Sequence, residues 1–177
     1  MRGVAVTIAA IALALVPAIG AAQEAPASTA ACTAMDKTLP PELAAWTAQT
    51  PLAAAASAAG LRKASLTLGK AVTADLPQTP QVHFVTQPEK PGGTVSHGGM
   101  FELNIDKAGT YVVALGSGAW IDVLKDGKPL MSTAHARGPA CLTLRKMVDF
   151  SLQPGRYVLQ VSANAEARLP ILLARRP

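Results

Sequence analysis

From Ala64 onward, short runs of β-branched and aromatic residues alternate with turn residues, at the spacing that is typical of an all-β protein. Asp126-Gly127 separates two of these runs and predicts a two-residue hairpin turn. The pattern predicts an all-β fold, an antiparallel β-sandwich of about eight or nine strands over residues 64–177. The expected strands are 71–76, 82–87, 100–105, 111–115, 120–125, 130–134, 147–152, 157–162 and 169–173.

One hairpin pattern occurs twice within this region. Residues 101–112 and residues 150–158 each contain a Phe-x-Leu run, a turn and a Gly-x-Tyr-Val run. Tyr111 and Tyr157 open the second strand of each unit, where a tyrosine hydroxyl can bond back to a backbone carbonyl a few residues upstream. Two copies of one hairpin fit a jelly roll or another two-sheet sandwich.

The first residues have the pattern of a secretory signal peptide. Arg2 precedes an uncharged apolar run over residues 4–16, and Pro17 ends that run. The run is shorter than the roughly 20 apolar residues of a membrane span. Small residues then lead to Ala22, after which we expect cleavage. The sequence therefore predicts that residues 1–22 are removed and that the protein is periplasmic or secreted, with no stable membrane span after processing.

Residues 23–63 are rich in alanine and proline. Up to Thr38 the segment has almost no large apolar side chain, so we expect a linker there. One short helical turn is expected to begin at Pro41 and to be anchored by Trp46. A second short helix is expected over 52–59. The sequence thus predicts a short helical segment in front of the sandwich.

The charge distribution argues against a nucleic-acid partner. The chain has 16 Lys and Arg against 11 Asp and Glu, a net charge of +5, but only 4% aromatic residues. Binding of nucleic acid calls for a basic stripe with stacking aromatic side chains. The basic residues here are scattered along the chain, so we expect a solvated basic surface instead.

Two cysteines, Cys32 and Cys141, follow the predicted cleavage site. Export to an oxidising compartment favours a disulfide, and two cysteines allow one intramolecular pairing. We therefore expect a Cys32–Cys141 bridge. A free Cys32, or a bridge between two chains, is the alternative.

Three histidines follow the signal sequence, and two of them are expected in loops, where functional sites are commonly built. A non-haem iron site needs two histidines and a carboxylate. His97 and His135 with Asp122 or Asp149 have the right residue types, but no metal-binding spacing connects them. Motifs such as His-x-His with a following Glu, His-Glu-x-x-His and Cys-x-x-Cys are absent. The sequence predicts no metal or cofactor, with Fe²⁺ on His97, His135 and Asp122 as the alternative.

The remaining polar residues predict a contact surface for a ligand. Trp120 and Asp122 lie on the same side of an expected strand, and Arg145-Lys146 precedes another. Trp120 fits either the core or a ligand platform, and Arg145 fits either solvent or an anion. The candidate binding residues are His97, Trp120, Asp122, His135 and Arg145.

Four segments, 39–43, 88–93, 116–123 and 145–150, together resemble a group of small exported bacterial proteins of uncertain role that are often labelled homogentisate 1,2-dioxygenase. The region 64–173 is similar to a β-sandwich of the pre-peptidase C-terminal type. The first resemblance implies an iron-dependent oxygenase acting on an aromatic diol. That dioxygenase family uses two histidines and a glutamate on a cupin-type barrel. No such motif is present here, so no catalytic residue is transferred.

These observations favour an exported, non-catalytic binding or accessory module over an enzyme. Its expected partner is an envelope component, either a glycan or a protein. The alternatives are the iron-dependent dioxygenase and a purely structural envelope domain. The oligomeric state stays open at this stage.

Overall fold

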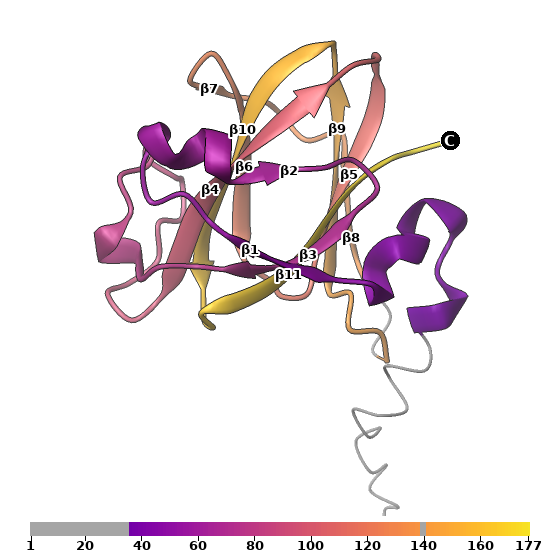
Figure 1. The fold of residues 1–177 in the computed structure, drawn as a ribbon, viewed down its shortest axis with the longest axis horizontal. Coiled ribbons are helices and arrows are strands. Elements are labelled where there is room, and N and C mark those ends of the chain that lie inside the picture. The colour runs from indigo at the N-terminus through magenta and orange to yellow at the C-terminus, as the bar shows by residue number, and fades with distance from the viewer. Residues whose placement is uncertain (1–35, 139–140) are drawn as a thin grey trace, which may run out of the picture.

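The computed structural model describes residues 36–138 and 141–177, which form two β-sheets packed face to face (Figure 1). The six-stranded sheet has the order β1-β3-β11-β5-β9-β8, and the five-stranded sheet has the order β2-β4-β10-β6-β7. The all-β sandwich is therefore confirmed. Two parallel pairs, β1–β3 and β2–β4, stand at the edges, and all other pairs are antiparallel.

The strands of the six-stranded sheet are β1 (Thr50–Ala53), β3 (Ala71–Asp75), β5 (Gly109–Leu115), β8 (Ala134–Arg137), β9 (Lys146–Leu152) and β11 (Arg168–Arg175). Those of the five-stranded sheet are β2 (Ser65–Leu66), β4 (His97–Ile105), β6 (Trp120–Lys125), β7 (Lys128–Pro129) and β10 (Gly155–Asn164). The described helices are the short 3₁₀ turns η1 (Asp36–Thr38), η2 (Pro41–Thr47), η3 (Ala58–Lys63) and η4 (Thr79–Gln81). The predicted signal peptide lies outside the described residues.

Seven of the expected strands are confirmed within a few residues of their predicted bounds. The strand expected over 82–87 is wrong, because this segment is irregular and crosses β10. There the amide of Gln160 accepts from the N–H of Thr86 and donates to its carbonyl, at 3.1 and 2.9 Å. The side chain of Gln160 thus makes the backbone hydrogen bonds that a neighbouring strand would otherwise make. The strand expected over 130–134 is also wrong, since β8 begins only at Ala134.

The expected helix over 52–59 is wrong as well. Leu52 lies in β1, which pairs in parallel with β3 and starts before the expected beginning of the sandwich at Ala64. The segment is alanine-rich and favours a helix locally, but pairing at the sheet edge overrides that preference. Pro51 fits this position, because an edge strand tolerates a residue without an N–H donor.

A second apolar cluster covers the outer face of the six-stranded sheet. Trp46 and Leu43 of η2 are fully buried there, together with Leu144 and Val112. In Figure 1 the indigo coils of η1 and η2 lie beside the sandwich. The N-terminal region therefore contributes a packed cover made of 3₁₀ turns, with Pro41 at the first position of η2, and no α-helix occurs among the described residues.

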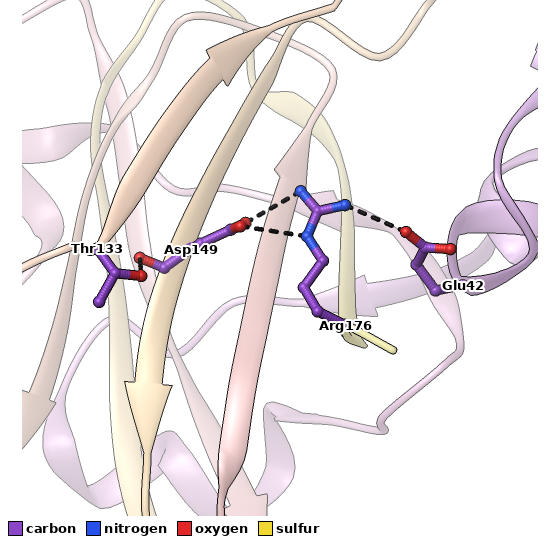
Figure 2. A network of polar contacts seen from close by, with 4 residues as sticks. All are labelled: Glu42, Thr133, Asp149 and Arg176. Carbon is purple, nitrogen blue, oxygen red and sulfur yellow. Dashed lines mark hydrogen bonds and ion pairs between the residues drawn. The ribbon is translucent and has the colours of Figure 1, made fainter.

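An ion-pair network ties this cover to the sheet (Figure 2). Arg176 donates two hydrogen bonds to the carboxylate of Asp149, at 3.1 and 3.2 Å, and one to Glu42, at 3.2 Å. The two carboxylates flank the guanidinium from β9 and from η2. The backbone carbonyl of Asp149 also accepts from the N–H and the hydroxyl of Thr133, just before β8. The network thus connects η2, β9 and the start of β8.

Gly98 and Gly99 lie inside β4 and are buried, although the sequence suggested a loop. A Cβ at Gly98 would lie 2.7 Å from the carbonyl oxygen of Val161, and one at Gly99 would lie 2.5 Å from the Cβ of Ala54. The missing side chains let neighbouring segments approach this strand closely. The glycine pair therefore reflects close packing against β4.

The hairpin predicted at Asp126-Gly127 is confirmed. Asp126 has a φ of 50° and Gly127 a φ of 74°, which is the two-residue turn with positive φ at both positions. The turn joins β6 to the two-residue β7 and places Lys125 opposite Lys128. Because β7 is so short, it covers only the last part of β6.

The two tyrosine units are equivalent in the structure. The hydroxyl of Tyr111 donates to the carbonyl of Lys107 at 2.7 Å, and that of Tyr157 donates to the carbonyl of Gln153 at 2.8 Å. Both rings are buried at the end of the sandwich core. Each hydroxyl closes the turn four residues upstream, as the repeated pattern predicted.

Removing either hydroxyl should destabilise the fold modestly. We expect Tyr111→Phe to lower the free energy of unfolding by about 1 kcal/mol, the net value of one hydrogen bond. Tyr157→Phe should cost more, because the Tyr157 hydroxyl also accepts from the N–H of Gln153 at 3.0 Å. Urea unfolding of both variants measures the difference. Wild-type stability in both variants would contradict a role for the hydroxyls.

Candidate functional site

The two sheets separate along one side of the sandwich and leave a cleft of about 1070 Å³. One wall comes from β6 with the loop residues Glu89 and Lys90, and the other from β8 and the first part of β9. Ile121, Val148 and Phe150 give the cleft an apolar floor that continues into the core. The site therefore combines a rigid β-scaffold with polar walls.

The residues of β8 explain why the sandwich stays open here. His135 lies opposite Val148 in the pairing of β8 with β9, and Arg137 lies opposite Lys146. Residues directly opposite each other share one face of a sheet, and Val148 faces the core. His135 and Arg137 thus occupy core-facing positions with side chains that resist burial. The core ends at β9, and the space beyond it becomes the cleft.

Trp120 and Asp122 alternate with the core residues Ile121 and Val123, so they lie on the opposite face of β6. Both are half-buried and line the cleft, which therefore extends round the edge of β6 to the outer face of the five-stranded sheet. The indole N–H of Trp120 donates to Oδ1 of Asp122 at 3.1 Å. Trp120 therefore stands at the surface of the cleft, and the core position that its sequence context also allowed is not adopted.

Two ammonium groups lie against the Trp120 ring. The Nζ of Lys90 is 4.7 Å from the ring centroid, and the Nζ of Lys146 is 5.5 Å from it. These distances are typical of cation–π contacts. The Lys146 ammonium also donates to the carbonyl of Ala119 at 2.8 Å, which fixes it at the junction of the two walls.

Burial perturbs two ionisable groups of the cleft. It lowers the pKa of Lys146, and the nearby charge of Lys90 lowers that pKa further, against an opposing effect of Asp122. Burial raises the pKa of Asp122, while the hydrogen bond from Trp120 acts in the opposite direction. Oδ2 of Asp122 is buried and has no hydrogen-bond partner in the described part of the chain. The cleft thus holds a cation and an acceptor that are both incompletely solvated.

Because the pKa of Asp122 is raised, we predict that Asp122→Asn increases the free energy of unfolding and that the increase depends on pH. In the folded state the charged carboxylate loses hydration, which destabilises the fold. This destabilisation is absent below the pKa of Asp122 in the unfolded chain, and it appears as the pH rises through the raised pKa of the folded state. Asparagine keeps the acceptor for Trp120 without the charge. We expect the variant to be more stable at pH 7, by less than about 1 kcal/mol because the half-exposed group is screened.

Urea unfolding at pH 7 and at pH 3 tests this prediction. The difference in the free energy of unfolding between Asp122→Asn and the wild type should disappear at pH 3, where both side chains are neutral. A variant that is less stable than the wild type at pH 7 would show that the carboxylate stabilises the fold.

Four of the five candidate binding residues line this one cleft, namely Trp120, Asp122, His135 and Arg145. His97 does not line it. His97 begins β4 and pairs with Asn164 of β10, and its Nδ1 is buried without a hydrogen-bond partner among the described residues. The structure thus brings together most of the predicted contact surface and leaves His97 apart.

Of the residues of the alternative iron site, Asp122 and His135 line the cleft and His97 lies on another strand outside it. β10 separates β4 from β6, so the strands of His97 and Asp122 are about 10 Å apart at the usual strand spacing. No three His, Cys, Asp or Glu side chains within residues 36–138 and 141–177 are placed to hold one metal ion. The iron-dependent alternative therefore stays a prediction from sequence, without a geometric counterpart here.

Sequence reasoning did not assign Lys90, Arg137 or Lys146 to the site. The alternation of alanine with polar residues over 134–137 was a usable signal, because it puts both polar side chains on one face of a strand. The position of Lys90 had no such signal. It depends on how the loop before β4 crosses the five-stranded sheet.

The wall that carries Arg145 and Lys146 is anchored from the N-terminal segment. Asp36 is buried and accepts from the N–H of Thr143, at 2.9 Å, and from its hydroxyl. Trp46 donates its indole N–H to the same hydroxyl, at 2.8 Å. The linker expected up to Thr38 is therefore wrong at its end, where Asp36 is part of the folded domain.

Cys141 is half-buried at the start of the same loop. Cys32 lies outside the described residues, so the Cys32–Cys141 disulfide stays a prediction. Thiol labelling of the denatured, unreduced protein tests it, and no label is expected on either cysteine.

Comparison with known proteins adds no family to this description. No protein-family model matches the chain, and no curated protein matches its sequence. Among the described residues, no helix has the length and apolar character needed to cross a membrane. The fold and the site define an all-β sandwich with an open-sided, mainly basic cleft.

Proposed function

We propose that this protein is a non-catalytic binding module that acts in the periplasm or after secretion, and that its cleft holds part of an envelope glycan or protein. The observation that carries the proposal is the gathering of Trp120, Asp122, His135 and Arg145 in one cleft. An accessible aromatic ring beside a few placed polar groups is the usual composition of a ligand site.

The position of these residues also favours binding. Trp120 and Asp122 stand on β6 and His135 on β8, so the paired backbone of two sheets sets the spacing of the walls. Sites on strands are more rigid than sites on loops, and a preorganised site loses less entropy on binding. The signal-peptide pattern of residues 1–22 supports the proposed location.

Co-sedimentation with envelope fragments of the producing cell tests the proposal. We expect the purified protein to sediment with the fragments, and Trp120→Ala to abolish the association. Val95→Ala is the matched control, because Val95 is 82% exposed and does not line the cleft. Digestion of the fragments with protease before mixing distinguishes a glycan from a protein partner.

Two results would contradict the proposal. One is sedimentation that Trp120→Ala leaves unchanged, which would move the binding surface away from the cleft. The other is an intact mass that retains Met1 in protein recovered from the membrane fraction, which would overturn the proposed location. The expected mass corresponds to a chain that begins at Gln23.

A further inference from the structure

We propose that the ligand of the cleft is an acidic saccharide whose carboxylate lies between Lys90 and Lys146 beside the Trp120 ring. The inference rests on the proposed function, because it names the ligand class of the same site. It goes beyond that function by assigning the charge of the ligand and the residues that recognise it.

The first support is that three cations of the cleft, Lys90, Arg137 and Lys146, make no ion pair with a carboxylate of the described residues. Ion pairs between described residues join Arg168 to Asp75, and Arg176 to both Glu42 and Asp149. Lys90, Arg137 and Lys146 make no such pair within residues 36–138 and 141–177. Exposed lysines are often unpaired, but Lys146 is half-buried. Holding an unpaired ammonium partly away from water is unfavourable, and an anion bound in the cleft would remove that cost.

The second support is the arrangement of the two ammonium groups. Both lie against one indole ring, at 4.7 and 5.5 Å from its centroid, so that their charges are close enough to perturb each other. Within residues 36–138 and 141–177, Lys146 donates one hydrogen bond, to the carbonyl of Ala119, and an ammonium has three N–H groups. Its remaining donors are available to a ligand oxygen. An anion bound between the two ammonium groups is attracted by both, and this attraction offsets the repulsion between them.

The third support distinguishes a saccharide from an acidic peptide. Asp122 and Glu89 line the same cleft, and the buried Oδ2 of Asp122 needs a hydrogen-bond donor. A sugar acid supplies hydroxyl donors next to its carboxylate, so it can satisfy both the ammonium groups and Asp122. The side chains of a peptide rich in Asp and Glu offer acceptors alone, so such a peptide would have to satisfy Asp122 with a backbone N–H.

The test is calorimetric titration of the folded protein with four probes. These are tetramers of galacturonate and of mannuronate, the neutral methyl ester of the galacturonate tetramer, and tetraglutamate. We expect at least one uronate tetramer to bind about tenfold or more tightly than the neutral ester, the effect of about one charge-assisted hydrogen bond. The affinity should fall as salt is raised.

Variants and a spectroscopic signal locate the binding. Lys90→Gln and Lys146→Gln should each weaken binding of the uronate tetramer about tenfold. Lys107→Gln, an exposed lysine outside the cleft, should leave it unchanged. The indole N–H resonance of Trp120 should shift on titration, while that of the fully buried Trp46 should stay in place. Unfolding curves of the variants confirm that each is folded.

Three outcomes would overturn the inference. Equal binding of the neutral ester would remove the role of the carboxylate, and tighter binding of tetraglutamate would replace the saccharide by an acidic peptide. Failure of both uronate tetramers, in a protein that still co-sediments with envelope fragments through Trp120, would refute the acidic saccharide and leave the binding module intact. Failure of both experiments would refute the proposed function as well.

Discussion

Replacing Trp46 with alanine is expected to lower the free energy of unfolding by about 3–5 kcal/mol, the usual cost of truncating a fully buried aromatic side chain. Trp46 has no exposed surface and fills the cluster between η2 and the outer face of the six-stranded sheet. The indole N–H also donates to the hydroxyl of Thr143, so the substitution leaves Thr143 and Asp36 with a weakened network. Chemical denaturation followed by far-UV circular dichroism measures the loss.

Two further variants separate the causes. Trp46→Phe keeps an aromatic ring but loses the N–H donor, so it should cost less than the alanine variant. Trp120→Ala removes the other tryptophan of the chain, which is only half-buried at the cleft, and should cost clearly less than Trp46→Ala. If Trp46→Ala and Trp120→Ala were equally stable, the N-terminal cover would not be part of the cooperative unit.

Replacing Arg176 with methionine is expected to lower the free energy of unfolding by about 2–3 kcal/mol. The substitution removes three charge-assisted hydrogen bonds and leaves the carboxylates of Glu42 and Asp149, each 16% exposed, without their common partner (Figure 2). The Arg176 side chain is 27% exposed, which keeps the loss below that of a fully buried ion pair. The same carboxylates hold the pKa of Arg176 above its usual value, and Asp149 has the larger effect.

A double-mutant cycle with Glu42→Gln tests the assignment of this loss. Arg176→Met and Glu42→Gln together should cost less than the sum of the two single variants, because the second change removes a charge that the first leaves unpaired. The ion pair of Arg168 with Asp75 is a suitable comparison, since both side chains are more than half exposed, at 79% and 55%. Arg168→Met should be nearly neutral. Equal losses for the two arginines would contradict the network.

Much of the sandwich could be predicted because its strands carry their own signals. Alternation of apolar and polar residues identifies β6 with its observed bounds, and Asp126-Gly127 identifies the turn that follows it. The expected strand over 82–87 fails because one side chain from a distant strand, Gln160, satisfies the backbone at Thr86. Contacts of that kind are long-range and leave no local pattern.

The candidate site also has one part that local sequence patterns predict and another part that they do not. Trp120 and Asp122 could be paired in advance because residues two apart on a strand share a face. Their meeting with His135 depends on how the two sheets stack, which no local pattern describes. The N-terminal cover shows most clearly what the sequence could not predict. The low apolar content near Asp36 predicted a linker there. A single buried carboxylate that binds Thr143 was enough to order that end of the segment.

The place of β11 in its sheet has a consequence for folding kinetics. β11 is the last strand along the described chain, yet it lies between β3 and β5, and its Arg168 pairs with Asp75, which lies about half the sequence away. The N-terminal half of the six-stranded sheet therefore cannot assemble until residues 168–175 are available. Such non-local pairing slows folding, because a long loop must close before its contacts can form. A chain of this topology can therefore complete its six-stranded sheet only after residues 168–175 have been synthesised.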